Sequence, residues 1–367
     1  PAQSVVLGIQ HAFAMFGATV LAPFLMGFDA NLAILMSGIC TILFFFMTGG
    51  RVPSYLGSSF AFIGVVIAAT GYAASGTGAP NANIALAAGG IMACGVLYAI
   101  FGFIVMATGT RWIEKLMPPV VTGAVVMIIG LNLAPITIKG VAGNNFNMWM
   151  ALVTVLCMGS IAVFTKGLLQ RLLLLVGLLL AYLTYYIISN VMGYGTPINF
   201  APIQQASWFG LPQFHAPEFS ANAMLIIAPI ALILVAENLG HIKAVGAMTG
   251  ENLDPHIGKA FVADGIATTL SGGVGAPGMT TYGENIGVMA VTRVYSTIIF
   301  VFAGVFAIFL GFSPKFGAII HTIPTAILTG ASIVVFGLIT IAGAKIWIEN
   351  KVDFSQNKNL MVAAVTI

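Results

Sequence analysis

A carboxylate interrupts a long apolar region in the stretch Thr280-Thr281-Tyr282-Gly283-Glu284-Asn285-Ile286-Gly287-Val288-Met289-Ala290-Val291-Thr292-Arg293. The Thr-Thr-Tyr segment before Gly283 favours an extended strand, and the residues after Glu284 favour a short helix. An acid at the centre of a bilayer costs at least ~2.5 kcal/mol, which indicates a functional site. Irregular backbone is tolerated there only where protein or a wet cavity satisfies its polar groups. The stretch therefore predicts an interrupted membrane span whose half-helix points at a ligand.

The composition of the chain is that of a membrane protein. Hydrophobic residues make up 59% of its 367 residues and charged residues only 6%. Such a chain could not cover the surface of a soluble domain. Because about 20 residues cross a ~30 Å hydrocarbon core, the chain has room for a dozen or so spans. Its three cysteines, Cys40, Cys94 and Cys157, lie singly in apolar runs and predict neither a disulfide framework nor a thiolate metal site.

Apolar runs separated by polar or Gly/Pro stretches predict the individual spans. Seven runs precede a longer link at about 195–220, and we interpret this link as the connection between two halves. A final run opens at Asn359 and stops at Ile367 in mid-segment, so we expect part of the protein to be missing there. The complete runs lie at about 4–26, 31–49, 54–71, 83–107, 117–137, 147–165, 171–194, 221–244, 256–271, 276–292, 295–312 and 321–345.

The positions of the basic residues predict the orientation. With the N-terminus inside, eleven of the thirteen Lys and Arg residues fall in inner loops, and only Lys139 and Lys315 fall outside. Because inner loops carry an excess of positive charge, this count predicts a cytoplasmic N-terminus.

Internal similarity predicts that the second half repeats the first. Residues 122–131 align without gaps to residues 329–338 and are identical at five of ten positions. Residues 57–62 and 280–284 are alike in kind, since each segment is small, polar and strand-like before a short helix. Seven is an odd number of spans, so the second half must be inserted upside down. The pattern predicts an inverted-repeat transporter whose two interrupted segments form the binding site at the midplane.

Few ionisable residues lie within the apolar runs. Glu237 and His241 are one helical turn apart and project from one face, where they could share a proton or, alternatively, tie two spans together. Gln10 and His11 hold the same place in the first half, and His11 is as readily structural as functional. Asp264 is either a second proton site or a hydrogen-bond partner for the broken backbone.

Three apparent catalytic motifs fail on inspection. Residues 273–278 fit G-x-G-x-x-G but place a proline where a helix should start, so no dinucleotide site is expected. Glu237 and His241 have metal-like spacing but lack a third ligand. Ser58 and Ser59 lack the G-x-S-x-G context of a hydrolase. We therefore expect no enzyme, no metal ion, no cofactor and no nucleic-acid partner.

Four motifs together point to a known family: Gln10 to Ala18, Tyr55 to Phe62, Ala236 to His241, and Thr280 to Arg293 with its Glu-Asn-x-Gly. Through them the whole chain resembles the nucleobase:cation symporter-2, or nucleobase–ascorbate, transporters, and among these the bacterial uracil/pyrimidine permeases.

The resemblance implies an all-α polytopic membrane protein with fourteen spans in two inverted sevens, of which the chain covers about 12.5. Two short strands would lie at interrupted spans 3 and 10. A core domain would comprise residues 1–116 and 221–312, and a gate domain residues 117–194 and 313–367, with 195–220 as the link. The resemblance further implies a homodimer in the bacterial cytoplasmic (inner) membrane.

The resemblance also implies a site in which two acids hydrogen-bond a nucleobase and two backbone segments bind its carbonyls. The residues of this substrate site are Ala18, Phe60, Glu237, Tyr282, Gly283 and Glu284. Proton coupling would involve Glu237 and His241, with Asp264 as a further candidate. The chain departs from the family pattern at Asn238, where many members have histidine, and at Phe336, where a uracil permease can have a gate tyrosine.

These observations predict a proton-coupled symporter that imports uracil or a related pyrimidine by movement of the core against the gate. Uracil offers N–H donors and carbonyl acceptors, which two acids and two backbone segments would complement. The alternatives are a xanthine or purine symporter of the same family and an anion transporter of similar architecture. An anion transporter should carry positive charge at the breaks, whereas the side chains here are acidic.

Overall fold

The computed structural model describes residues 2–72, 80–139 and 141–367, and helices account for most of them. The helices are α1 Ala2–Met26, α2 Ala30–Met47, α3 Ala61–Thr70, α4 Ile84–Thr108, α5 Arg111–Leu116, α6 Pro119–Lys139, α7 Asn145–Phe164, α8 Leu168–Arg171, α9 Leu173–Tyr186, α10 Ala201–Gln205, α11 Ala221–Ile227, α12 Ile230–Thr249, α13 Ile257–Gly273, α14 Gly283–Thr292, α15 Ile298–Gly311, α16 Pro314–His321, α17 Thr325–Glu349 and α18 Asn357–Thr366. Two strands, β1 Leu56–Ser58 and β2 Met279–Thr281, are the extended elements of the described residues.

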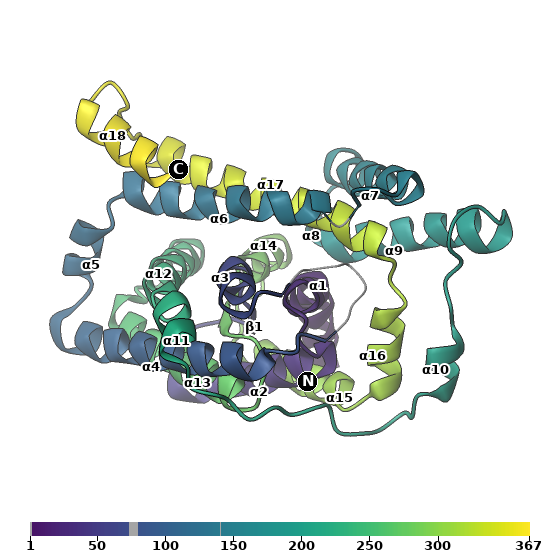
Figure 1. The fold of residues 1–367 in the computed structure, drawn as a ribbon. Coiled ribbons are helices and arrows are strands. Elements are labelled where there is room, and N and C mark those ends of the chain that lie inside the picture. The colour runs from purple at the N-terminus through teal and green to yellow at the C-terminus, as the bar shows by residue number, and fades with distance from the viewer. Residues whose placement is uncertain (1, 73–79, 140) are drawn as a thin grey trace.

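The helices form two layers. In Figure 1, α6 and α17 run side by side along the top with α7 and α9, and α1, α3, α12 and α14 lie beneath them. Most buried apolar side chains belong to one core cluster, which is formed mainly by the lower layer and also includes Leu133 of α6 and Val335 and Phe336 of α17. A second, smaller cluster forms where α7, α9 and α17 meet, around Met158, Leu178 and Ala331. The α6–α17 layer therefore packs partly on the main core and partly on a cluster of its own.

The helix pairing has the two-fold pattern expected of an inverted repeat. Strand β1 pairs with β2 in antiparallel fashion, with Gly57 opposite Thr280. The most extensive packing is of α4 on α13, of α6 on α17 and of α2 on α15. In a repeat of seven spans, α4 corresponds to α15 and α13 corresponds to α2, so the pair α4–α13 has its counterpart in the pair α15–α2. The pairs α6–α17 and β1–β2 each join two corresponding elements. The inverted repeat predicted from the sequence is confirmed.

Glycines allow the paired helices to approach closely. Gly95 and Gly265 face each other where α4 crosses α13, and a Cβ added to either would lie 2.7 Å from the other's carbonyl oxygen. Gly102 and Gly258 make the same kind of contact seven residues away along each helix. In a membrane, where lipid competes for apolar contacts, such small-residue interfaces hold helices together.

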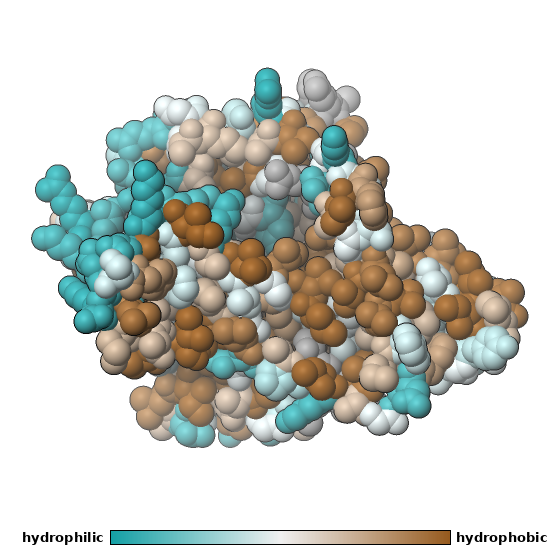
Figure 2. Space-filling view, turned by 90° about the horizontal axis from the view of Figure 1, so that it is seen from above, coloured by the Kyte–Doolittle hydropathy of each residue, from teal (hydrophilic) through white to brown (hydrophobic). Residues whose placement is uncertain are grey.

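The surface agrees with a membrane environment. Among the described residues, seven helical segments are long and apolar enough to cross a bilayer, and the bent pair α15–α16 makes an eighth if it is one span. The seven are Ser4–Met26, Ala30–Met47, Ile84–Thr108, Asn145–Phe164, Leu173–Val191, Ala221–Thr249 and Thr325–Glu349. Seen from the side of α6 and α17, the surface is mainly hydrophobic, and hydrophilic side chains gather at the end where Figure 1 has α5 and α18 (Figure 2). Ile138 of α6 and Ile341 of α17 are among the exposed apolar residues.

Two short helices were not anticipated from the apolar runs. Helix α5 follows Gly109, whose φ of +79 allows the chain to turn away from α4. Helix α16 is bent by 81° from α15 and begins at Pro314, with the Ser313 hydroxyl capping the N–H of Phe316. Both helices connect the two layers, and neither is apolar for long enough to give a span signal in the sequence.

We predict that Gly265→Leu destabilises the protein by about 1–3 kcal/mol, because the new side chain meets the backbone of α4 and cannot be accommodated by a rotamer change. Thermal unfolding of the purified protein in detergent measures this. The control is Gly159→Leu on α7, where an added Cβ meets nothing within 4 Å. Equal unfolding midpoints for the two variants would contradict the proposed role of the glycine contact.

Candidate functional site

The two interrupted segments meet at the β1–β2 pair. Beyond the strands, the Ser59 N–H donates to the carbonyl of Gly278 at 3.0 Å, and the Tyr282 N–H donates to that of Tyr55 at 3.1 Å. Helices α3 and α14 begin directly after these bonds. Because the strands are antiparallel, Phe60 and Gly283 lie beyond opposite ends of the small sheet. The meeting of the segments is thus confirmed, with the two helix starts at its two ends.

Tyr282 locks the sheet together. Its hydroxyl donates to the carbonyl of Ser58 at 2.7 Å, and its ring covers Gly57, where a Cβ would lie 2.6 Å from the ring carbons. Tyr282 is buried, and so is Ala18 on α1. Phe60, by contrast, is partly exposed. The expected pocket-lining roles of Ala18 and Tyr282 stay predictions, since both side chains are packed inside the protein.

Two acids lie beside the start of α14. Glu284 belongs to the first turn of α14, and Glu237 reaches the same region from α12. Both are partly exposed, and neither forms an ion pair with another described residue. The side chain of Tyr282 does not cap the first turn of α14, and the first turn of an α-helix has backbone N–H groups without intrahelical partners. The two carboxylates therefore lie beside a helix start.

A chain of hydrogen bonds runs from His241 to Asp264. The Thr281 hydroxyl donates to the amide oxygen of Asn238 at 3.2 Å and contacts Nδ1 of His241 at 3.0 Å. The Asn238 amide donates to Asp264 at 2.6 Å and to the Tyr98 hydroxyl at 2.8 Å. Asp264 and Asn238 are fully buried. This network links the site to the interior of the α4–α12–α13 packing.

The network determines the tautomer of His241. The Asn238 amide uses both its hydrogens on Asp264 and Tyr98, so its oxygen accepts from Thr281. A hydroxyl has one hydrogen, and His241 Nδ1 must therefore donate to Thr281. In the neutral ring, Nε2 is then an acceptor, and it faces Gly283, where an added Cβ would lie 3.0 Å away.

Asn238 is the site residue that sequence reasoning missed. From the sequence, Asn238 is only a departure from the histidine that many family members have there. In the structure it is the centre of the buried hydrogen-bond network with Asp264 and Tyr98. Its position directly after Glu237 was the available signal. Asp264 accepts hydrogen bonds from the side chains of Asn238 and Tyr98, and its expected role as a partner for the broken backbone stays a prediction. Its expected part in proton coupling stays a prediction.

His11 has a structural role in this arrangement. Its Nδ1 lies 3.0 Å from the Oδ1 of Asn285 on α14, and its ring packs on Phe300 with centroids 4.8 Å apart. Only 1% of His11 is exposed. The pair His11–Asn285 ties α1 to α14, as His241–Thr281 ties α12 to β2.

The second layer reaches the site through Phe336. This residue of α17 meets the ring of Phe60 edge-on, with centroids 6.4 Å apart. The contact covers the start of α3 with a residue from the α6–α17 layer. Within residues 2–72, 80–139 and 141–367, no group of three His, Cys, Asp or Glu side chains could hold a metal ion.

A sequence model described as "Permease family" matches residues 2–367. The chain belongs to this family, the nucleobase:cation symporter-2 permeases. The resemblance inferred from the four motifs is confirmed. Members of the family are permeases rather than enzymes.

Relatives of this permease cover its whole length. It is 65% identical over 366 residues to the protein named "Putative pyrimidine permease RutG" of Escherichia coli K12. The alignment covers 100% of this chain and 82% of that protein. It is 37% identical over 378 residues to the uracil permease of the same organism, with 100% of this chain and 83% of the relative covered. The uracil permease of Paenibacillus larvae is also 37% identical, over 381 residues.

Two solved structures share the fold of the permease. The transmembrane domain of the cyanobacterium bicarbonate transporter BicA superposes with a TM-score of 0.65 at 16% identity, over 99% of this chain and 95% of that one. The murine anion transporter Slc26a9 superposes with a TM-score of 0.67 at 13% identity, over 90% of this chain and 59% of that one. At such identities the likeness shows the fold alone.

We predict that Asn238→Leu destabilises the permease by about 1–3 kcal/mol or more, because Asp264 and Tyr98 lose a buried donor. Thermal unfolding in detergent tests this against Asn132→Leu, the same change at an exposed position of α6. An Asn238→Leu protein as stable as the control would show that the network contributes nothing to stability.

Proposed function

We propose that this permease imports uracil or a closely related pyrimidine across the bacterial cytoplasmic membrane together with protons. The observation that carries the proposal is the pair Glu237 and Glu284, two acids without an ion-pair partner among the described residues, beside the interrupted segments. The names of the full-length relatives, pyrimidine and uracil permease, support this choice of substrate.

The chemistry of uracil complements the site. A flat ring with N–H groups and carbonyl oxygens needs acceptors and donors in one pocket. Glu237 and Glu284 supply the acceptors, and the backbone at Phe60 and Gly283 supplies donors at the helix starts. Phe336 and Phe60 supply aromatic surface against which a flat ring can pack.

We further propose that transport proceeds by movement of the two layers against each other. The moving bodies are a core of residues 1–116 and 221–312 and a gate of residues 117–194 and 313–367. The second apolar cluster, which forms where α7, α9 and α17 meet, supports this division. In our proposal the N-terminus is cytoplasmic and the protein is a homodimer, which the orientation of basic residues and the family resemblance respectively support.

Glu237 is our candidate for the coupling proton. Protonated Glu237 is neutral and can donate a hydrogen bond to a carbonyl of the base. Ionised Glu237 is repelled by Glu284 and favours a site open to water. His241 is on the same helix one turn away, and its network to Asp264 offers a path for charge rearrangement.

A purine or xanthine symporter and an anion transporter are the competing functions. Competition of labelled uracil uptake by unlabelled pyrimidines, purines and bicarbonate separates them, and we expect displacement by pyrimidines. Displacement by xanthine but not by thymine would assign the purine alternative. The acidic side chains beside the start of α14 disfavour an anionic substrate.

We predict that Glu284→Gln weakens uracil binding by about 1–3 kcal/mol, since a carboxylate that accepts from a ring N–H is replaced by an amide of equal size. Isothermal titration of the purified protein measures the affinity. The control is Glu251→Gln in an exposed loop, which we expect to bind like the wild type. Unchanged affinity in Glu284→Gln would remove this residue from the substrate site.

We predict that Glu237→Gln retains uracil binding with weaker pH dependence but no longer accumulates uracil against a gradient, because the amide mimics the protonated acid. Uptake into proteoliposomes under an imposed pH gradient measures accumulation, and exchange of internal for external uracil without a gradient shows that the variant still transports. If Glu237→Gln concentrates uracil in response to the gradient, the coupling proton resides elsewhere, with Asp264 and His241 as the next candidates.

A further inference from the structure

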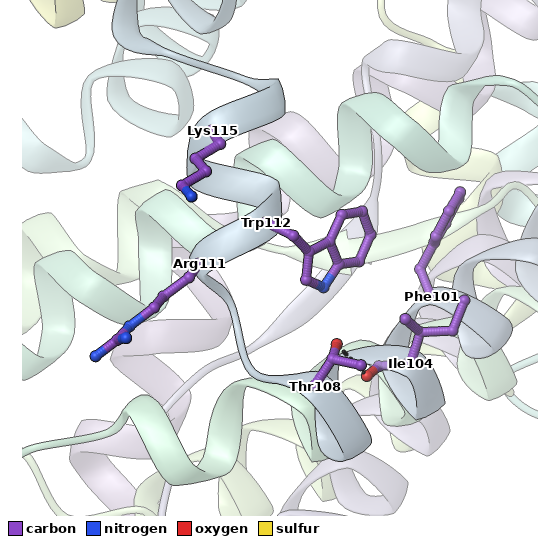
Figure 3. Close-up of a pocket in the computed structure, with 6 residues that line it drawn as sticks. All are labelled: Phe101, Ile104, Thr108, Arg111, Trp112 and Lys115. Carbon is purple, nitrogen blue, oxygen red and sulfur yellow. Dashed lines mark hydrogen bonds between the residues drawn. The ribbon is translucent and has the colours of Figure 1, made fainter.

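A cavity of about 580 Å³ lies outside the proposed transport site, between the end of α4 and the short helix α5. Figure 3 shows Trp112 turned toward the side chains of α4 and the two basic residues on the other side of α5. The lining residues are Phe101, Ile104, Thr108, Arg111, Trp112 and Lys115. The cavity thus has an apolar wall from α4 and a basic edge from α5.

The charge of this cavity is positive. Arg111 and Lys115 are four residues apart on α5 and exposed, so both can meet one ligand. No described acid lines the cavity. Glu114, between them in sequence, is engaged in an ion pair with Lys243 of α12, and Asp254 lines a neighbouring hollow that it shares with Arg111. An anionic group would be complementary to this edge.

Trp112 supplies an unsatisfied donor. Its ring lies against Phe101 with centroids 6.5 Å apart, and its indole nitrogen is buried without a hydrogen-bond partner among the described residues. The hydroxyl of Thr108, which also lines the cavity, donates to the carbonyl of Ile104 at 2.7 Å. A buried N–H without a partner is costly, and an acceptor from a ligand would satisfy it.

The wall of α4 continues beyond the cavity as an exposed apolar surface. Ile100, Phe103 and Ile104 are 47%, 58% and 40% exposed, and Val96 one turn earlier is 49% exposed. This strip extends along the helix from the cavity for about two turns. It fits a hydrocarbon chain that lies parallel to the helix.

We propose that this cavity binds an anionic phospholipid of the membrane in which the permease lies. Its phosphate would contact Arg111 and Lys115, an ester or phosphate oxygen would accept from the indole N–H of Trp112, and an acyl chain would follow the apolar strip of α4. The anionic headgroup matches the basic edge, the oxygen acceptor matches the unpaired indole N–H, and the acyl chain matches the exposed apolar strip of α4. Helix α5 joins α4 to α6 in the chain, and Glu114 of α5 also contacts Lys243 of α12. The lipid would therefore lie beside the connection between α4 and the α6–α17 layer.

Native mass spectrometry of the purified, detergent-solubilised full chain tests the proposal, with phosphatidylglycerol and phosphatidylcholine of identical acyl chains as probes. We expect the wild type to bind phosphatidylglycerol about 30-fold more tightly than phosphatidylcholine. The double variant Arg111→Gln/Lys115→Gln should lose that preference. Trp112→Phe keeps the ring against Phe101 but removes the N–H, and it should bind phosphatidylglycerol about fivefold more weakly.

The matched control is Lys351→Gln/Lys358→Gln, which removes the same charge from exposed positions outside the cavity. We expect it to bind phosphatidylglycerol like the wild type. Equal binding of the two lipids to the wild type would overturn the proposal, and so would an equal loss in the control, which would indicate general electrostatic attraction. Since no substrate is present, these results are independent of whether the permease carries uracil. Unchanged phosphatidylglycerol binding in Trp112→Phe would also overturn the lipid proposal. This single variant keeps the test decisive if the double variant Arg111→Gln/Lys115→Gln fails to fold.

Discussion

Backbone hydrogen bonding inside the bilayer is the constraint on which the structure of this permease depends. A span that stops being helical at membrane depth exposes N–H and C=O groups that lipid cannot satisfy. Here two spans stop in this way, and each supplies the partners that the other lacks through the pairing of β1 with β2. Neither interruption is stable without the other. The two halves of the chain must therefore fold against each other with these segments in contact.

The chemistry of the site follows from this pairing. Where the strands end, helices begin, and helix starts carry unsatisfied N–H groups that favour ligands with acceptor atoms. Glu237 and Glu284 add carboxylates at one of these places, and the His241–Thr281–Asn238–Asp264 network fixes the orientation of the surrounding side chains. Tyr282 closes the sheet between them. The same break in the helix thus creates both unpaired backbone groups and the candidate site.

Close glycine contacts position the helices around this centre. Gly95 with Gly265, and Gly102 with Gly258, bring α4 onto α13, while α6 lies on α17 in the other layer. Phe336 of α17 then reaches Phe60 of α3, so that the second layer covers one end of the sheet. Leu133 of α6 and Val335 of α17 belong to the same apolar cluster as the helices of the lower layer, so the two layers also pack on each other beside this aromatic contact.

The sequence by itself determined the membrane class, the two interrupted segments and their inverted relation, because hydropathy, odd span number and strand-like composition are local properties of the chain. It also singled out Glu237, His241, Asp264 and Glu284, since an ionisable residue in an apolar run is rare. Only the tertiary structure decided that Asn238 centres the polar network. Hydrogen-bond partners come from segments far apart in the chain, and their geometry exists only once the helices that carry them are packed. The same reason explains the burial of Ala18 and Tyr282, the structural use of His11, and the antiparallel register that sets Phe60 and Gly283 at opposite ends of the sheet.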